Sequence, residues 1–250
     1  MIESAVIQVA DLRKYYGSVR AVDGISFTVA KGATCALLGG NGAGKTTTIA
    51  MLLGLLLPTS GQIHMLGEEM PRCRQRVLPR INFSSPYMDL PQRLTVAENL
   101  TVYARLYGVR QIRERLAVLG RDLDITDYFK RPYGTLSAGQ KTRVALAKSL
   151  LNQPEILLLD EPTASLDPDT ADRMRRTLTD YQRESGATLL LASHNMSEVE
   201  RLCDQVIMLR AGHIVATGTP RELIHQYGRK DMEEVFLDIA RGIQSGEVVA

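Results

Sequence analysis

The sequence has few cysteines and no marked excess of either charge, and each shortage excludes a kind of site. Its three cysteines are odd in number, lie far apart and lack metal-ligand spacing: Cys35, Cys73 and Cys203. This pattern predicts buried or idle thiols in a reducing cytosol rather than a metal centre. Lys and Arg number 30 against 28 Asp and Glu, which gives a formal net charge of +2. Because nucleic-acid binding needs a strong basic excess or stripe, we expect no nucleic-acid partner.

A membrane-spanning run is missing as well. The longest apolar run, residues 49–57, is too short to cross a bilayer and is interrupted by Gly54. The first residues, Met1 to Ser4, lack the basic start and apolar stretch of a secretion signal, so we expect none. Any role at a membrane would then come through a partner. The 250 residues leave room for one large domain or two small ones.

The most informative segment is a glycine-rich octapeptide, residues 39–46, with the sequence GGNGAGKT. It fits the pattern G-x-x-x-x-G-K-[ST], in which glycines let successive backbone N–H groups point at phosphate oxygens. Lys45 supplies a charge for the β- and γ-phosphates, and the Thr46 hydroxyl is placed to bind Mg²⁺. The octapeptide predicts a site for a nucleoside triphosphate with Mg²⁺.

The surroundings of the octapeptide favour this interpretation over a plain glycine turn. A short apolar run, Thr34 to Leu38, precedes it and predicts a buried strand. An apolar helix is expected over residues 46–53, closed by Pro58 and Gly61. Strand, glycine loop and helix is the order that phosphate binding requires, because the helix N-terminus then faces the anion.

A second signal of phosphate chemistry is the aliphatic run Ile156 to Leu159, which ends in Asp160 and Glu161. Such a run predicts a central strand of a parallel sheet, buried on both faces, and active sites lie at the carboxyl ends of such strands. Asp160 is placed to hold Mg²⁺, and Glu161 to orient and polarise the attacking water. The alternative is structural, since acids commonly end strands and begin turns.

Between these two motifs lies the segment Leu136 to Gln140, with the sequence LSAGQ. Ser137 and Gln140 predict a helix capping box, which is a sufficient structural explanation of the segment. The helix would carry Val144, Ala147 and Leu151 on one apolar stripe. A capped helix start also presents N–H groups to an anion, so a functional role is compatible with capping.

These motifs, in this order, resemble those of the nucleotide-binding domain of ABC transporters. Residues 39–46 resemble the Walker A motif of that family, Leu157 to Glu161 its Walker B motif and Leu136 to Gln140 its signature motif. The match continues with Ser165-Leu166-Asp167, similar to the D-loop, and Ser193-His194, similar to the switch histidine. The resemblance covers roughly residues 5 to 220.

The resemblance implies roles for individual residues. ATP would be bound by Tyr16, Gly39, Asn41, Gly42, Ala43, Gly44, Lys45, Thr46, Thr47, Ser137 and Gly139. Catalysis would use Glu161 and His194, and Mg²⁺ would be held by Thr46 and Asp160. Two of these residues, and Asp167 of the segment similar to the D-loop, have a structural alternative. Tyr16 could be an ordinary partly buried aromatic rather than an adenine-stacking ring, His194 a strand-end histidine, and Asp167, with Pro168, the start of a helix.

The resemblance also implies the architecture: an α/β fold, with a P-loop NTPase core of mostly parallel sheet, an antiparallel β portion and a helical subdomain. The ATPase domain would span residues 1–220, with the helical subdomain at about 87–148 and a C-terminal helical extension over 221–250. Within that extension, Met232 to Ala240 resembles the ending of ATPase subunits of bacterial exporters. It is also explained as an ordinary amphipathic helix with Val235 and Ile239 on one face.

The sequence departs from the family pattern at three positions. Gly40 replaces a usual proline, which should loosen the loop entropically, and Ala138 replaces the first glycine of the signature pair. Pro86 stands where a glutamine usually contacts Mg²⁺ and water, and proline has neither an amide side chain nor an N–H. Either a hydroxyl of Ser84 or Ser85 substitutes, or coupling at this loop is altered.

By resemblance, the chain would be the ATPase of a transporter, most simply a head-to-tail homodimer whose ATP-driven closure moves an integral membrane permease subunit. It would lie in the cytoplasm, on the inner face of the cell membrane, and residues 84–94 would contact the permease. Export is favoured by the tail. The alternative is a soluble ABC ATPase acting outside transport, as in iron–sulfur assembly. A metabolic kinase is disfavoured by the signature and D-loop together.

Overall fold

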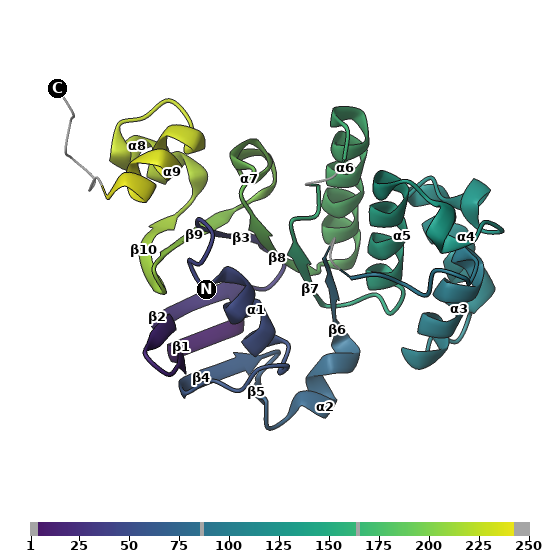
Figure 1. Ribbon diagram of the computed structural model, residues 1–250, viewed down its shortest axis with the longest axis horizontal. Coiled ribbons are helices and arrows are strands. Elements are labelled where there is room, and N and C mark those ends of the chain that lie inside the picture. Colours follow the sequence, from purple (N-terminus) through teal and green to yellow (C-terminus); the bar gives the residue numbers. More distant parts are fainter. Residues whose placement is uncertain (1–4, 86–87, 164–165, 243–250) are drawn as a thin grey trace. The chain divides into compact units, whose positions relative to one another are not determined.

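The computed structural model describes residues 5–85, 88–163 and 166–242, and the chain forms two compact units (Figure 1). Unit 1 combines the residues up to Leu78 with those from Thr188 onward, and unit 2 comprises residues 79–187. The boundaries expected by resemblance, a helical subdomain at about 87–148 and an extension after residue 220, stay predictions.

Unit 1 contains an antiparallel sheet in the order β2-β1-β4-β5. Its strands are β1 (Ala5–Tyr16), β2 (Val19–Ala30), β4 (Ser60–Met65) and β5 (Glu68–Met70). Along β2 the buried Ile25, Phe27 and Val29 alternate with exposed residues, as expected of a sheet with one face on the core and one in solvent. This sheet is the antiparallel β portion that the sequence predicts.

Unit 1 also holds strands in the order β10-β9-β3-β8, of which β3 runs parallel to β8 and β9. Their bounds are β3 (Thr34–Leu38), β8 (Thr188–Ser193), β9 (Gln205–Arg210) and β10 (His213–Gly218). Every residue of β3 and β8 is buried, which explains why these strands are unbroken runs of mainly apolar residues rather than alternating patterns.

The helices of unit 1 are α1 (Lys45–Leu52), α2 (Arg74–Val77), α7 (Met196–Leu202), α8 (Pro220–Tyr227) and α9 (Met232–Arg241). The amphipathic helix expected near the end of the sequence is confirmed as α9, with Val235 and Ile239 buried. Cys35 and Cys203 are buried, as expected of idle thiols.

Unit 2 pairs two parallel strands and carries four longer helices. These elements are β6 (Ile81–Ser84), β7 (Ile156–Asp160), α3 (Val96–Leu106), α4 (Ile112–Asp122), α5 (Ala138–Leu150) and α6 (Pro168–Ser185). The N-terminus of α6 confirms the predicted cap, since Asp167 Oδ1 accepts a hydrogen bond from the Thr170 N–H at 3.1 Å. No helix within the described ranges is long and apolar enough to cross a membrane.

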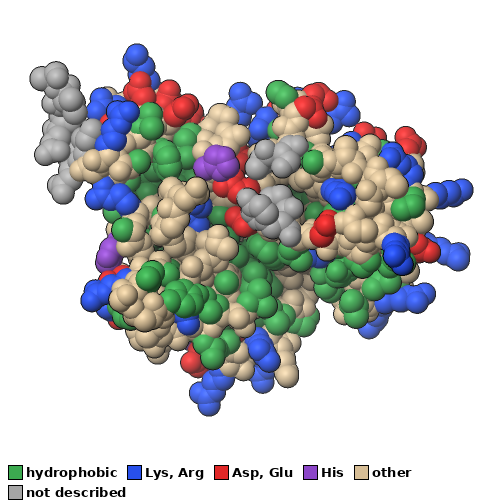
Figure 2. Space-filling view, in the orientation of Figure 1, with side chains coloured by type: hydrophobic (Ala, Val, Ile, Leu, Met, Phe, Trp, Pro, Cys, Tyr) green, Lys and Arg blue, Asp and Glu red, His purple; other side chains and the backbone are tan. Residues whose placement is uncertain are grey.

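The strands and helices confirm the expected fold class, an α/β fold with parallel strands, an antiparallel portion and a helical part. On the face shown in Figure 2, Lys and Arg side chains are interspersed with Asp and Glu.

Helix α5 is more deeply enclosed than a single apolar stripe predicts, because every residue from Val144 to Leu150 is buried. One of them is Lys148, which is 4% exposed. Its Nζ donates to the Phe83 carbonyl at 3.0 Å and lies 5.8 Å from the centre of the Tyr103 ring. Burial lowers the pKa of Lys148 from 10.5 to about 8, since desolvation penalises the charged ammonium.

This buried lysine makes stability depend on pH. The unfolded chain keeps the Lys148 proton up to the ordinary pKa of 10.5, whereas the folded chain releases it near 8. Stability therefore rises as pH increases from about 8 toward 10.5 and falls as pH drops back through about 8. Relative to Lys148→Met, wild-type unfolding free energy should gain about 2 kcal/mol between about pH 7.5 and about pH 9.5. Urea unfolding of both proteins at the two pH values measures this, and a pH-independent difference would contradict it.

Candidate functional site

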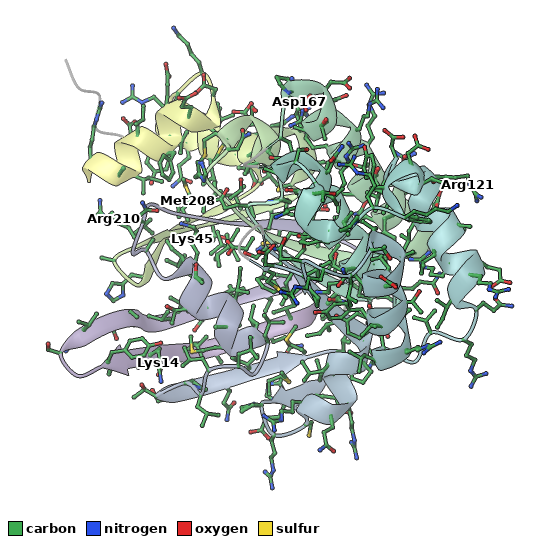
Figure 3. All side chains as sticks on the ribbon, turned by 45° about the vertical axis from the view of Figure 1, so that its right-hand side comes forward. Lys14, Lys45, Arg121, Asp167, Met208 and Arg210 are labelled. Carbon is green, nitrogen blue, oxygen red and sulfur yellow. The ribbon has the colours of Figure 1, made fainter. Side chains whose placement is uncertain are left out.

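The glycine-rich octapeptide, named here the phosphate loop (residues 39–46), connects the end of β3 to the start of α1. Strand, loop and helix follow in the predicted order. Figure 3 labels Lys45 at the start of α1 and Met208 on β9, the strand paired with β3. Because β3 is buried along its whole length, the loop emerges from the end of a fixed strand.

Two glycines of the loop are required by close backbone approach. A Cβ added at Gly39, where φ is +155°, would overlap the Leu209 carbonyl oxygen and lie 2.7 Å from the Ala43 Cβ. A Cβ at Gly44, where φ is +108°, would lie 2.7 Å from the Ala21 carbonyl oxygen. Side chains are thus excluded at both positions by their neighbours and by their backbone conformation.

Gly40 differs from these two glycines. A Cβ built there would meet no atom within 4 Å, and its φ lies outside the left-handed region. The structure therefore leaves room for a side chain at the position where the family usually has proline. Compared with proline, glycine therefore increases the conformational freedom of the backbone here, and it does not relieve a steric clash.

Lys45 bends back over the loop. Its Nζ donates to the Gly39 carbonyl at 2.6 Å and to the Gly40 carbonyl at 3.1 Å. In this position the ammonium group lies over the loop rather than extended into solvent. The contact places a cation where a bound phosphate chain would need it.

The first turn of α1 completes the loop as an anion site. Its N-cap is Gly44, and no side chain among the described residues caps the helix. The N–H groups of the first turn and the positive end of the helix dipole therefore face the loop. Asn41 and Thr46 are exposed, Thr47 is half-buried and Ala43 is buried.

Tyr16 ends β1 with 51% of its surface exposed, and the Lys14 Nζ lies 5.0 Å from its ring centre. The neighbouring Tyr15 points elsewhere, since its hydroxyl donates to Asp23 Oδ1 at 2.5 Å. Tyr16 is thus half exposed, as an aromatic ring at a stacking site would be, with the Lys14 ammonium near its ring.

His194 directly follows β8, whose last residue, Ser193, pairs in register with Leu38 at the end of β3. The histidine and the phosphate loop therefore leave the sheet at the same edge. The buried Ser193 hydroxyl donates to Glu198 Oε2 at 2.9 Å and accepts from the Asn195 N–H at 3.1 Å. These bonds fix the turn on both sides of His194, which is exposed.

In unit 2, Asp160 is the last residue of β7 and is 8% exposed. The buried Ser85 hydroxyl donates to its Oδ2 at 3.4 Å. Glu161 follows with φ +49°, a left-handed conformation that residues other than glycine rarely adopt. Five other residues besides glycine share a positive φ in the described part of the chain, so this conformation describes the turn after β7 and not a catalytic role.

The predicted capping box at the start of α5 is confirmed. Ser137 Oγ accepts from the Gln140 N–H at 3.3 Å, and Gln140 Oε1 accepts from the Ser137 N–H at 3.0 Å. Ser137 is exposed and Gly139 half-buried. A Cβ added at Gly139 would make an ordinary contact of 3.4 Å with the Leu166 side chain. Within the chain, Gly139 is therefore not demanded by packing.

The donor atoms fit Mg²⁺ better than a metal enclosed by protein. Mg²⁺ prefers oxygen ligands, keeps several waters and is usually held by one or two carboxylates plus substrate phosphates. Asp160 in unit 2 and the exposed Thr46 hydroxyl in unit 1 are donors of this type. No group of three or more His, Cys, Asp or Glu side chains in the described part of the chain could hold a metal.

The predicted site residues thus divide between the units. Unit 1 brings the phosphate loop and His194 to one sheet edge and carries Tyr16, whereas Ser137, Gly139, Asp160 and Glu161 belong to unit 2. Pro86 and Ser165 lie outside the described residues. The approach of Leu209 to the loop was not predictable from the sequence, since an apolar strand residue carries no motif.

Known proteins resemble this chain along most of its length. A family model described as "ABC transporter" matches residues 22–164. The chain is 39% identical over 240 residues to the Nod factor export ATP-binding protein I of Ralstonia nicotianae, which covers 93% of this chain and 73% of that protein. It is 38% identical over 233 residues to the bacitracin transport ATP-binding protein BcrA of Bacillus licheniformis, covering 92% of this chain and 74% of that protein.

Solved structures agree with the fold. The structure of an ATP binding subunit of an ABC transporter superposes with a TM-score of 0.87 at 27% identity, covering 94% of this chain and 99% of that one. A dimeric ATP-binding cassette bound to ADP and Pi superposes with a TM-score of 0.79 at 21% identity, covering 85% and 98%. At the lower identity the likeness shows the fold alone.

Proposed function

Since the chain belongs to the ATP-binding domain family of ABC transporters, we propose that it is an ATPase subunit that drives a separate membrane subunit, in export. The observation that carries the proposal is the phosphate loop, which joins a buried strand to a helix whose N-terminus has no side-chain cap among the described residues. Lys45 lies over this loop. Binding of ATP is the activity that this geometry supports best.

In the proposed ATP complex, the amides of residues 41–46 and the first turn of α1 hold the β- and γ-phosphates, with Gly39 shaping the start of the loop. Lys45 exchanges its two carbonyl contacts for phosphate oxygens, which are stronger partners because they carry charge. Thr47 supports the loop from the same turn, and Tyr16 stacks on the adenine.

For hydrolysis, we assign Glu161 to orient and polarise the attacking water and His194 to contact the γ-phosphate and that water. Thr46 and Asp160 would hold Mg²⁺, which when bound neutralises charge on the phosphates. The Ser85 hydroxyl contacts Asp160, and Ser85 directly precedes position 86 in the sequence, where the family glutamine is missing. Of the two hydroxyls considered from sequence, this contact favours Ser85.

The start of α5 supports a second copy of the chain as partner. Ser137 and Gly139 lie at a capped helix N-terminus that has donors to offer to an anion. We propose that they complete the ATP site of a second copy in a head-to-tail homodimer. ATP would close the dimer, and loss of the γ-phosphate would remove the bridging charge and open it.

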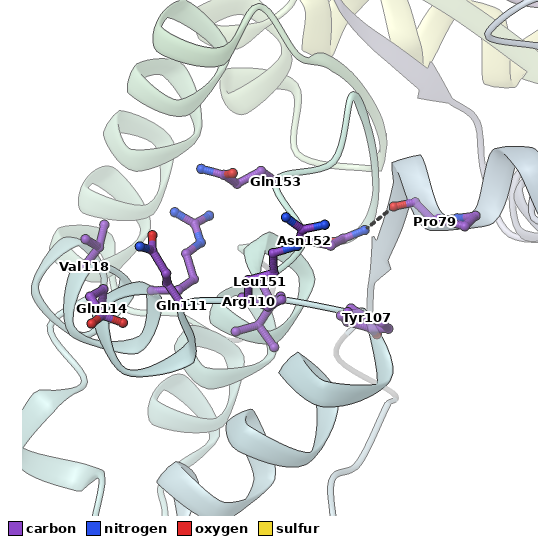
Figure 4. A pocket seen from close by; sticks show the side chains of 12 residues that line it. Pro79, Tyr107, Arg110, Gln111, Glu114, Val118, Leu151, Asn152 and Gln153 are labelled. Atoms are coloured by element: carbon purple, nitrogen blue, oxygen red, sulfur yellow. Dashed lines mark hydrogen bonds between the residues drawn. The ribbon is translucent and has the colours of Figure 1, made fainter.

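Unit 2 offers a surface for the membrane subunit. A cavity of about 660 Å³ is lined by Tyr107, Arg110, Glu114 and Asn152 among others (Figure 4). Just before it in sequence, Leu106 at the end of α3 is 72% exposed. A hollow with mixed charge and an apolar border suits a short cytoplasmic helix. We propose this hollow as a contact for the membrane subunit in addition to residues 84–94, and such contacts would hold the chain on the inner face of the membrane.

The proposed direction, export, is supported by relatives named Nod factor export ATP-binding protein I. What these proteins carry does not identify a substrate for this chain, because the substrate pocket belongs to the membrane subunit. The competing function is a soluble ABC ATPase acting outside transport, as in iron–sulfur assembly. The same surface would then take a soluble partner.

The test is purification of a tagged Glu161→Gln chain from native membranes with ATP, followed by identification of the co-purifying proteins. We expect a polytopic membrane protein at a ratio of about one to one, because the variant should hold the ATP-bound state. Recovery of a soluble partner alone, with the chain absent from membranes, would overturn the transport proposal. A Lys45→Ala chain is the matched control, since it should not hold that state.

A further inference from the structure

The end of β9 and the turn that follows it, residues 211–212, contact the phosphate loop at Gly39 and Ala43. The Leu209 carbonyl lies so close to Gly39 that a side chain there would overlap it. The Gly212 N–H donates to the Ala43 carbonyl at 3.2 Å. Just before these contacts the ladder between β3 and β9 is regular, with Leu38 opposite Met208. A displacement of this turn would therefore move the loop that binds phosphate.

On one side the turn is held by β2. The Asp23 N–H donates to the Gly212 carbonyl at 2.8 Å. The Asp23 side chain, buried to 8% exposure, accepts from Arg20 at 3.0 Å and lies 3.8 Å from His213 Nε2. The Tyr15 and Arg20 hydrogen bonds lower the pKa of Asp23, so it stays ionised and paired.

On the other side the turn is held by the C-terminal helix. Arg210, the last residue of β9, donates from Nη1 to the Ile239 carbonyl at 2.7 Å (Figure 3 labels Arg210). That carbonyl belongs to the last turn of α9, where the helix dipole is negative and a guanidinium group is favoured. Gly242 makes room for it, because a Cβ there would lie 3.2 Å from Nη1 at φ +84°.

Helix α9 is itself anchored within unit 1. Val235 and Ile239 are buried, and the Met232 N–H donates to Glu200 Oε1 at 2.5 Å. The salt bridge between Arg229 and Asp238 joins the segment before α9 to its last turns. Helix α9 is therefore held in place within unit 1, so the hydrogen bond from Arg210 to this helix can restrain the turn.

We propose that Arg210 is a positioning residue for nucleotide binding, which makes the C-terminal helix part of the machinery that holds the phosphate loop. The inference rests on the proposed role of that loop in binding phosphate. Arg210 touches neither Gly39 nor Ala43 but fixes the strand end that does. A shift of the loop's amides away from phosphate oxygens weakens every bond they make, so the effect should appear in affinity.

The experiment measures the affinity of the purified full chain for ATP and for inorganic tripolyphosphate, which carries the phosphate chain without the base. The variants are Arg210→Met, which removes the donor, and Arg210→Lys, which keeps one. Arg241→Met, which removes a neighbouring positive charge from the last turn of α9, is the matched control. Should Arg210→Met fail to fold, Gly242→Ala disturbs the same contact from the helix side.

For Arg210→Met we expect both dissociation constants to rise by the same factor, about fivefold, with kcat at saturating ATP nearly unchanged. Arg210→Lys should restore most of the affinity, and Arg241→Met should resemble wild type. Unchanged affinity for tripolyphosphate in Arg210→Met, or an equal loss in Arg241→Met, would overturn the inference. Lys45→Ala separates the two proposals: if it too leaves tripolyphosphate binding intact, the phosphate site itself is wrong.

Discussion

Replacement of Glu161 by glutamine is expected to reduce ATP hydrolysis by a factor of about 100 to 10,000, the range over which a positioned general base acts. Glutamine keeps the size of the side chain and one acceptor oxygen, but it cannot take a proton from water. The phosphate loop belongs to unit 1 and is untouched, so nucleotide affinity should remain. Phosphate release and equilibrium ATP binding by the purified chain measure the two effects.

The same variant should also accumulate a closed dimer in ATP, because bound nucleotide is no longer consumed. Light scattering after gel filtration, with and without ATP, reports this change. Glu155→Gln is the matched control. Glu155 immediately precedes the start of β7, at the opposite end of the strand from Glu161, and its carboxylate pairs with Arg80 at 2.6 Å. Turnover close to wild type in Glu161→Gln would remove Glu161 as the base, whatever its oligomeric state.

Lys45→Ala is expected to weaken ATP binding about 10- to 100-fold, as the loss of a charge-assisted contact to phosphate requires. Tripolyphosphate should lose a similar factor, because the lysine contacts no part of the adenosine in the proposed complex. Titration calorimetry of both ligands measures the effect.

Two controls make the Lys45 result specific. Lys31→Ala removes an exposed lysine just before β3, so it tests whether any loss of positive charge in unit 1 reduces affinity. Melting temperature tests whether the variant loses the loop itself, since Lys45 holds two of its carbonyls. Undiminished affinity in a folded Lys45→Ala chain would contradict the phosphate role.

The buried strands and helix starts were predictable because their signals are local. The apolar runs that form β3 and β7 predict buried strands, since a strand covered on both faces shows no alternation of polar and apolar residues. Ser137 with Gln140, and Asp167 before Pro168, satisfy backbone donors within three residues of themselves. Such features need no knowledge of the rest of the fold.

The features that escaped prediction join distant parts of the chain. Nothing in the residues around Leu209 indicates that its carbonyl would exclude a side chain at Gly39. Lys148 lies on the apolar stripe of its helix, four residues after Val144, but nothing in the sequence indicates that its ammonium would be enclosed between β6 and α3. The left-handed backbone conformation at Glu161 was not predictable, because the residue that adopts it is not a glycine. From the sequence, Ser85 is one of two hydroxyls that could substitute for the missing glutamine, and its contact with Asp160 joins residues 75 positions apart.

The capping box at Ser137 determines which hydrogen bonds the Ser137 hydroxyl can still make. Because the oxygen already accepts from the Gln140 N–H, its own hydrogen is left to be donated outward. The Gln140 side chain is turned back, and its Oε1 accepts from the Ser137 N–H. With the first-turn amides of α5, the helix start is therefore rich in donors, while one lone pair of each capping oxygen is already used. A group that brings many lone pairs, such as a fully ionised phosphate, matches this surface better than a neutral alcohol with a single oxygen.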